Sequence, residues 1–278
     1  MTDTTSATET AEVSETADVN DDIIDRCADT LDAAVRDRVA IPRLTLAHPE
    51  LSVELAYLVQ EERTRRRVAA GDPVIGAKLG LTARAKQVQM KVAEPVYGAL
   101  FAGDLHPSEE PLPMATLIHP RVEPEIVFLM GEELRGPGIH AADVLAATKA
   151  VCCGMEVIDS RYADFSFTAA DVVADNTSEA LVVLGSRMVD PQELDLRLLG
   201  LMLEDNGEFV ASATGAATMG HPADAVALLA NWLGARSQSL EAGWLVFTGG
   251  LTAAVPVRAG HSITATFAHL GSVTVRPG

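Results

Sequence analysis

The pattern of apolar and polar residues divides the chain into a helical first quarter and a strand-rich remainder. Apolar residues recur at helical spacing over residues 22–41 and 50–70, so both stretches are expected to be helices. The "GDP" at 71–73 predicts the end of the second helix. After it, "VIGAKLGLT" predicts a strand, "ARAKQVQM" a short helix, and "PVYGALF" an extended segment.

From residue 119 onward the pattern is that of short strands with a few packed helices. Strands are expected at "EPEIVFLMG", "GMEVIDS" and "EALVVLGS", and helices at "HAADVLAATKAV" and "HPADAVALLANWLGA". The "DNG" between two apolar runs predicts a β-hairpin, and "GWLVFTGGL", "VPVRAGHSITATF" and "GSVTVRP" predict further short strands. Because strands and helices do not alternate strictly, a doubly wound parallel sheet is not favoured. The pattern predicts an α+β fold, with a β-rich body behind a helical cap.

Composition adds domain boundaries to this picture. Residues 1–25 contain eight acids and no Lys or Arg, and the first 21 show no periodic apolar face. We therefore expect a disordered acidic tail at 1–21, a helical cap at 22–72 and a β-rich catalytic body at 73–278. The cap and the body are expected to form one continuous domain.

Charge and cysteine content exclude several functional classes. The 278 residues carry a net charge of −18 and 48% are hydrophobic, with no basic stripe. This argues against binding to nucleic acid or to anionic membranes. There is no signal peptide and no apolar run long enough to span a bilayer. Cys27, Cys152 and Cys153 make a poor disulfide framework, so a cytoplasmic location is expected.

Two glutamates at the start of a predicted strand are the main chemical feature. In "HPRVEPEIVFLMG", Glu123 and Glu125 flank Pro124 and project to the same face, because strand residues two apart share a face. Two such carboxylates repel unless a cation or a shared proton relieves them, and Mg²⁺ or Mn²⁺ prefers oxygen ligands. Glu156, within an apolar strand, is a candidate third ligand. The alternative is a solvated strand edge, with Glu156 paired to an arginine.

Lys78 is the second unusual residue. The chain has only four lysines, and Lys78 lies in the apolar "VIGAKLGLT". The pattern alone favours a surface lysine with an extended stem, whereas the functional interpretation is a desolvated ammonium that transfers a proton or holds a carboxylate.

Other motifs carry less information. Nucleotide-binding glycine motifs, paired histidines with metal-ligand spacing and a serine-hydrolase elbow are absent from the sequence. In "TGGL" at 248–251, Gly249 and Gly250 follow a predicted strand, so their backbone amides could approach an anionic ligand. A plain tight turn is equally compatible with the pattern.

A series of blocks, in order, resembles a known family. "GAKLGLTARAKQVQM", "EPVYG", "HPRVEPEIVFL", "MEVIDSRYADFSF", "DVVADNTSEALVVLG" and "TGGLTAAVPVRAGHSITATF" are similar to blocks of the 2-hydroxypentadienoate hydratase and 4-oxalocrotonate decarboxylase family. That family belongs to the fumarylacetoacetate hydrolase superfamily. The resemblance runs from about residue 45 to the C-terminus and implies a mixed-sheet body of the fumarylacetoacetate hydrolase C-terminal type.

The resemblance also implies site residues and an activity. It places the metal ligands at Glu123, Glu125 and Glu156, with Mg²⁺ or Mn²⁺ as cofactor, and the active-site lysine at Lys78. Substrate contacts are expected at Ser160, Asn176, Gly249 and Gly250.

The implied reaction is metal-dependent decarboxylation of 2-oxo-3-hexenedioate in aromatic meta-cleavage catabolism. The hydratases usually read "PDFG" where this chain has "PVYG", and Val96 cannot activate water as an acid could. The alternatives left open are a 2-hydroxypentadienoate hydratase, a C–C hydrolase of the same superfamily and a non-catalytic scaffold subunit. The expected partners are a small dicarboxylate substrate, further copies of the chain and a hydratase.

Overall fold

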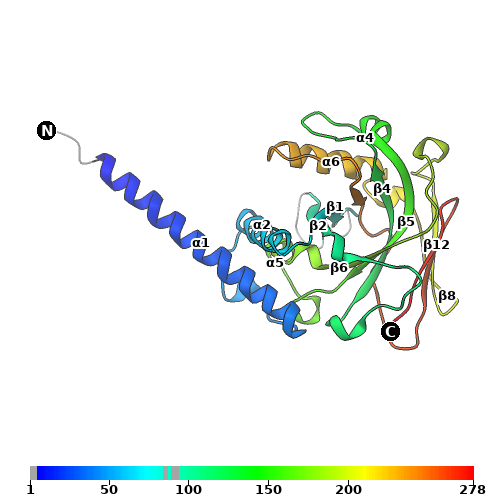
Figure 1. Ribbon diagram of the computed structural model, residues 1–278, viewed down its shortest axis with the longest axis horizontal. Helices are drawn as coiled ribbons and strands as arrows, with labels where there is room; N and C mark the ends of the chain where they lie inside the picture. Colours follow the sequence, from blue (N-terminus) through cyan, green and yellow to red (C-terminus); the bar gives the residue numbers. More distant parts are fainter. Residues whose placement is uncertain (1–4, 84–86, 89–93) are drawn as a thin grey trace.

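Two helices open the chain. The computed structural model describes residues 5–83, 87–88 and 94–278, with side chains from residue 20 onward. Helix α1 (Thr5–Asp37) begins inside the range predicted to be disordered, and its first half extends away from the body (Figure 1). Helix α2 (Val53–Ala69) begins where the Ser52 hydroxyl accepts a hydrogen bond from Leu55 N, an N-cap that satisfies a free helix amide.

Ion pairs join α1 to α2. Arg66 lies 2.9 Å from Asp25 and 2.7 Å from Asp29, and Arg63 lies 2.8 Å from Asp32. The three aspartates recur every three or four residues, so they share one face of α1. The arginine-rich end of α2 therefore faces α1 in part. The domain boundaries themselves stay predictions.

An eight-stranded sheet forms the centre of the body. Its order is β2-β1-β9-β4-β5-β6-β3, with β10 beside β4. The strands are β1 (Val74–Gly80), β2 (Val96–Phe101), β3 (Leu105–His106), β4 (Arg121–Met130), β5 (Thr148–Ile158), β6 (Glu179–Leu184), β9 (Leu245–Phe247) and β10 (Val255–Pro256).

This sheet curls into a roll. β2 runs through a 3₁₀ turn (Ala102–Asp104) into β3, and β3 pairs with β6, so the two ends of the sheet are joined by continuous chain. β1 and β9 are parallel, and β4 is antiparallel to both β9 and β5. Consequently β1, β5 and β9 end, and β2, β4 and β6 begin, at one end of the roll, which we call the mouth.

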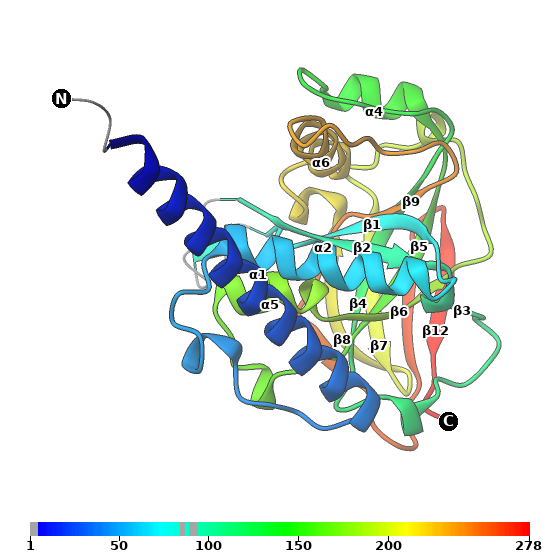
Figure 2. The ribbon, with the colours of Figure 1, turned by 60° about the vertical axis from the view of Figure 1, so that its left-hand side comes forward.

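Helices and a second sheet cover the outside of the roll. The second sheet has the order β12-β11-β7-β8, and Figure 1 shows it beside the long, curved β4 and β5. Helices α4 and α6 lie together, and α2 crosses in front of β1 and β2 in Figure 2. The bounds are α4 (Ala141–Ala147), α5 (Ala169–Ala174), α6 (Pro222–Gly234), β7 (Gly200–Asp205), β8 (Glu208–Thr214), β11 (Ile263–Phe267) and β12 (Gly271–Val275).

The predicted α+β fold is confirmed, including the hairpin β7–β8 and the helix α6. One helix was predicted to be too long. Its last four residues, "TKAV", belong to β5, because Thr148 and its neighbours pair with β4 and complete the central ladder. α5 was missed inside the loop after β5. The helix expected at "ARAKQVQM" lies largely outside the described residues. In the described part of the chain, no helix has the length and apolar character needed to cross a membrane.

Candidate metal centre

Three carboxylates converge inside the mouth of the roll. Glu123 and Glu156 are direct partners across the antiparallel pair β4–β5, and Glu125 follows Glu123 on the same face of β4. One carboxylate oxygen from each of the three lies within 4.8 Å of the others. Glu125 and Glu156 are completely buried. The prediction that the three glutamates share one space is therefore correct in its geometry, and the solvated-edge alternative is wrong.

Lys78 occupies the same space. It lies on β1, and its Nζ is 2.8 Å from Glu156 Oε1 and donates to the Thr177 carbonyl at 3.1 Å. Its exposed fraction is 2%, so the pattern-based preference for a surface lysine is wrong. The partner of Glu156 is this lysine and not an arginine. Burial alone would lower the pKa of Lys78, but the neighbouring Glu156 and Glu125 outweigh burial and raise it.

Glu125 and Glu156 are not fully satisfied by this one cation. Glu125 Oε1 and Glu156 Oε2 have no hydrogen-bond partner among the described residues. Burial, followed by the like charge of Glu156, raises the pKa of Glu125 well above its usual range, and burial also raises the pKa of Glu156. A buried, unpaired carboxylate costs several kcal/mol, which a hard divalent cation would offset. The cluster therefore fits a Mg²⁺ or Mn²⁺ site in its donor type, its convergence and its unsatisfied oxygens.

The glycine loop after β9 contacts the acidic cluster directly. Gly249 N donates to Glu125 Oε2 at 2.7 Å. Gly249 has φ +97°, and a Cβ there would lie 2.2 Å from Thr82 Oγ1. A Cβ on Gly250 would lie 2.4 Å from Glu123 Oε2. A side chain at either position would displace Thr82 or Glu123, so the two glycines let this loop lie close to the candidate ligands.

Ser160 and Asn176 lie in loops that follow β5 and α5. The Ser160 hydroxyl accepts from Tyr162 N at 3.2 Å, and its carbonyl lies 2.6 Å from His119 Nε2. The Asn176 amide pairs with both backbone groups of Ala99 on β2, at 2.8 Å each. Their predicted role as substrate contacts, and that of Gly249 and Gly250, stays a prediction.

The backbone turn that supplies the Thr177 carbonyl was not found from the sequence. Asn176, Thr177 and Ser178 have φ of 48°, 55° and 64°, a run of left-handed residues that is costly outside glycine. This conformation lets one turn hold β2 through Asn176 and face Lys78 through Thr177. No residue pattern in "DNTSEA" announces it.

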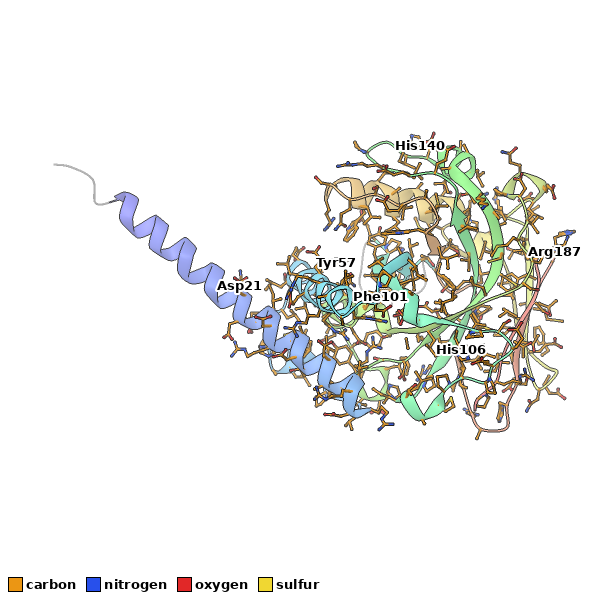
Figure 3. All side chains as sticks on the ribbon, in the orientation of Figure 1. Asp21, Tyr57, Phe101, His106, His140 and Arg187 are labelled. Carbon is orange, nitrogen blue, oxygen red and sulfur yellow. The ribbon has the colours of Figure 1, made fainter. Side chains whose placement is uncertain are left out.

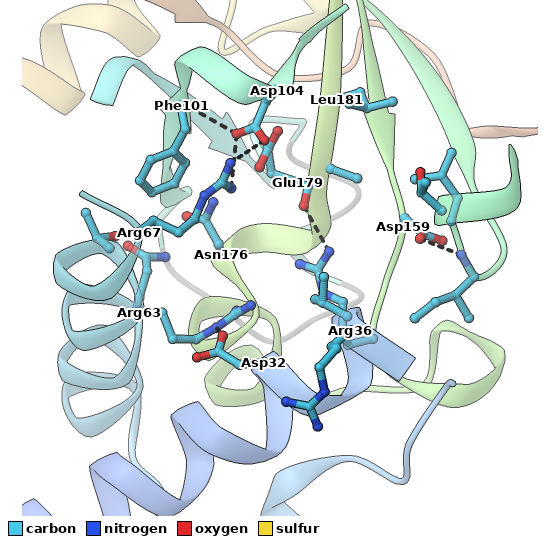
Figure 4. A pocket seen from close by; sticks show the side chains of 18 residues that line it. Asp32, Arg36, Arg63, Arg67, Phe101, Asp104, Asp159, Asn176, Glu179 and Leu181 are labelled. Carbon is cyan, nitrogen blue, oxygen red and sulfur yellow. Dashed lines mark hydrogen bonds and ion pairs between the residues drawn. The ribbon is translucent and has the colours of Figure 1, made fainter. Parts of the chain in front are cut away.

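A second group of charges lies where α2 meets the start of β6. Figure 4 shows a cavity of about 450 Å³ between α1, α2 and the start of β6, which Arg67, Asp104 and Glu179 line. Arg67 pairs with Asp104 at 2.7 Å, while burial and the nearby Asp104 raise the pKa of Glu179 well above its usual range. Within the described residues, this group lacks the three converging carboxylates that form the cluster in the mouth.

Comparison with known proteins shows which family the chain belongs to. A scan against models of protein families finds no match. The 4-oxalocrotonate decarboxylase of Pseudomonas sp. strain CF600 is 45% identical over 249 residues, which are 90% of this chain and 94% of that protein. Proteins named as hydratases are also similar, at 41% identity for one from Pseudomonas putida and 35% for one from Escherichia coli.

The chain belongs to the hydratase and decarboxylase family. A solved 4-oxalocrotonate decarboxylase from Pseudomonas putida G7, complexed with magnesium and adipate, superposes with a TM-score of 0.89 at 42% identity, covering 93% of this chain and 98% of that one. A fumarylacetoacetate hydrolase family protein from Yersinia pestis CO92 shares the fold alone, at TM-score 0.57 and 16% identity over 74% of this chain and 94% of its own. The family resemblance read from the sequence blocks is thereby confirmed.

Proposed function

We propose that this chain is a metal-dependent carboxy-lyase that converts 2-oxo-3-hexenedioate to 2-hydroxypenta-2,4-dienoate and CO₂. The observation that carries the proposal is the set of buried carboxylate oxygens without partners that face Lys78 inside the mouth. Membership of the family and the 45% identity to a 4-oxalocrotonate decarboxylase support the choice of reaction. The proposed pathway context is aromatic meta-cleavage catabolism.

Glu123, Glu125 and Glu156 would hold the metal ion. Mg²⁺ is the first candidate, because a similar decarboxylase is complexed with magnesium and the donors are all oxygens. When bound, the ion would act as a Lewis acid toward the 2-oxo group of the substrate. Gly249 N, which donates to Glu125, and Gly250, whose missing side chain leaves room for Glu123, would hold two of the ligands in position.

The proposed reaction balances without an organic cofactor. The bond between C5 and C6 breaks, and C6 leaves as CO₂. Its electron pair forms the C4–C5 double bond, the former C3–C4 pair moves to C2–C3, and the 2-oxo oxygen takes up one proton. Lys78 is the proposed proton donor, because the surrounding carboxylates raise its pKa and keep it an ammonium.

Val96 favours decarboxylation over hydration. It lies opposite Gly80 in the β1–β2 ladder, so it shares the face of Lys78 at the mouth, and it is buried. An apolar side chain there cannot take a proton from an attacking water, whereas loss of CO₂ needs no water. The hydratase stays the second candidate because several similar proteins carry that name.

The proposal also covers the binding partners of the chain. A small dicarboxylate is the proposed substrate, and assembly into a homo-oligomer or with a hydratase is proposed from the family alone. Isolated chain that binds Mg²⁺ and releases CO₂ unaided would remove the scaffold alternative.

The test is to supply the purified, Mg²⁺-loaded protein with 2-oxo-3-hexenedioate and with 2-hydroxypenta-2,4-dienoate in separate reactions. We expect CO₂ from the first and no hydration of the second. Formation of 4-hydroxy-2-oxopentanoate from the second substrate, without CO₂ from the first, would establish the hydratase instead.

A further inference from the structure

A row of side chains on β4 defines two directions out of the acidic cluster. Arg121, Glu123, Glu125 and Val127 alternate onto one face of the strand, with Arg121 at the mouth and Val127 toward the floor of the roll. The pairing of Arg121 with Ile158, beside the pairing of Glu123 with Glu156, confirms that Arg121 lies next to the cluster on that face.

The floor leaves no room for a ligand. Val127 belongs to a small, buried apolar cluster with Leu100, Cys152, Val182, Leu245 and Phe247. A Cβ on Gly154 would lie only 2.5 Å from Val127 Cγ2 and 2.8 Å from Phe247 Cε1. A substrate anchored at the glutamates must therefore extend outward, along β4 toward Arg121.

An aromatic contact holds the Arg121 side chain in place on this outward path. Its guanidinium carbon lies 3.9 Å from the centre of the Phe165 ring, and the His119 ring packs on Phe165 at 4.7 Å. Stacking fixes the guanidinium plane and leaves its N–H edges available. Among the described residues no carboxylate lies within ion-pair distance of Arg121, although Glu123 is two positions away on the same face.

We propose that Arg121, positioned by Phe165, is a subsite for the distal carboxylate of a linear six-carbon dicarboxylate. The inference rests on the proposed function and deepens it by assigning the end of the substrate remote from the metal centre. Planar guanidinium and carboxylate groups match in a two-pronged hydrogen bond, and lysine does not reproduce this geometry.

The spacing between Arg121 and Glu123 matches the length of a six-carbon dicarboxylate. Residues two apart on a strand are separated by about 6.8 Å, which is the offset from Arg121 to Glu123. An extended chain of six carbons places its terminal carbons about 6 Å apart, because its five bonds of about 1.5 Å follow a zigzag. The similar decarboxylase complexed with adipate, also a six-carbon dicarboxylate, shows that a relative binds an acid of this length.

The role of Arg121 is binding rather than bond cleavage. CO₂ is neutral, so the ion pair with the carboxylate is lost as C6 departs, and Arg121 does not stabilise the product. Substitution of Arg121 should therefore raise KM more than it lowers kcat, and it should distinguish dicarboxylates from monocarboxylates.

The experiment compares two unreactive 2-oxo acids that differ only in the distal carboxylate. Binding of 2-oxoadipate and of 2-oxohexanoate to Mg²⁺-loaded protein is measured by calorimetry for the wild type, Arg121→Gln, Arg121→Lys and Phe165→Leu. Arg187→Gln is the matched control, since Arg187 lies on the outer surface of the body (Figure 3).

We expect the wild type to prefer 2-oxoadipate by roughly ten- to hundredfold, the range of a charge-assisted hydrogen-bonded pair. Arg121→Gln should abolish that preference without weakening 2-oxohexanoate, Arg121→Lys and Phe165→Leu should reduce it in part, and Arg187→Gln should keep it. Equal weakening of both acids by Arg121→Gln, or no change in either, would overturn the subsite. If the Arg121 variants keep the preference for 2-oxoadipate while the wild type releases CO₂, the subsite is wrong and the proposed function stands. If the wild type releases no CO₂, the proposed function itself is wrong.

Discussion

Two buried clusters of charge, one containing Glu156 and the other containing Arg161, differ in how completely they are satisfied. Arg161 and Asp175 form a buried ion pair in which Arg161 N also donates to Asp175 Oδ2 at 3.1 Å and Arg161 Nη1 donates to the Glu179 carbonyl at 2.9 Å. The mouth cluster instead gathers three carboxylates around Lys78 and leaves two oxygens without a partner in the described part of the chain.

The difference separates a structural ion pair from a binding site. In the Arg161–Asp175 pair the backbone amide and all three guanidinium nitrogens of Arg161 donate to an acceptor, so nothing further is needed for the pair to persist. In the mouth, Glu125 and Glu156 bring two buried carboxylates against one ammonium, that of Lys78, and this excess of negative charge is stable only with protons or a cation bound. Burial of charge alone therefore does not distinguish these two clusters, whereas the unpaired oxygens of Glu125 and Glu156 do.

The largest expected effect comes from Glu125→Gln. The amide removes one charged ligand but can still accept from Gly249 N, so the loop should keep its place. We expect CO₂ release to fall by about a thousandfold or more, on the scale of losing a principal electrostatic catalytic element. Glu208→Gln on the exposed strand β8 is the control and should keep full activity.

The same variant tests the stability side of the comparison. Removing a buried acid whose pKa is raised should leave the metal-free protein as stable as the wild type, or more stable, in chemical denaturation. A large loss of stability together with unchanged Mg²⁺ binding would place Glu125 with the structural pair instead.

Lys78→Met is expected to lower kcat by roughly 10²- to 10⁴-fold, the usual contribution of a positioned acid–base group. Because the ammonium competes with a metal ion for Glu156, Mg²⁺ should bind as tightly as in the wild type or more tightly. Steady-state kinetics and calorimetry separate the two effects. Unchanged turnover would remove Lys78 from the chemistry.

Asp175→Asn should show the opposite behaviour. It leaves the buried Arg161 without its counter-charge, and we expect a loss of about 3–5 kcal/mol in the free energy of unfolding. The folded fraction should still bind Mg²⁺ normally. Urea denaturation with and without Mg²⁺ measures the free energy of unfolding and the stabilisation by the metal ion. A variant that is as stable as the wild type but binds Mg²⁺ poorly would show that Asp175 belongs to the metal site.

A smaller effect is expected from Gly249→Ala. The added methyl group collides with Thr82, and the left-handed backbone disfavours alanine, so Gly249 N moves away from Glu125. Loss of such a supporting contact should weaken Mg²⁺ binding by about 10- to 100-fold. Gly207→Ala, in the β7–β8 turn, is the matched control because it also has positive φ but contacts no ligand. Equal metal affinity in both variants would contradict the role given to the loop.

Strand alternation made the acidic cluster partly predictable. Glu123 and Glu125 share a face in any straight strand, and an acid within "GMEVIDS" was a natural third member. The direct pairing of Glu156 with Glu123 depends on the β4–β5 register, which no local pattern specifies. Lys78 reached the same space because β1 joins the roll beside β9, a pairing across more than 160 residues.

Contacts made by backbone groups could not be predicted in this way. The donation from Gly249 N to Glu125 and the acceptance by the Thr177 carbonyl depend on dihedral angles that several loop conformations of the same sequence could avoid. The pairing of the Asn176 amide with Ala99 on β2 was likewise not predicted from the sequence, and its role as a substrate contact stays a prediction. Arg121 was visible in "HPRVEPE", but its stacking on Phe165 was not.

The most direct test of the central claim is a crystal of this protein soaked in Mn²⁺ and measured for anomalous scattering. The account predicts one strong peak in the mouth, within bonding distance of carboxylate oxygens from Glu123, Glu125 and Glu156. No such peak, in crystals that bind Mn²⁺ only elsewhere on the protein, would contradict the assignment of the metal centre.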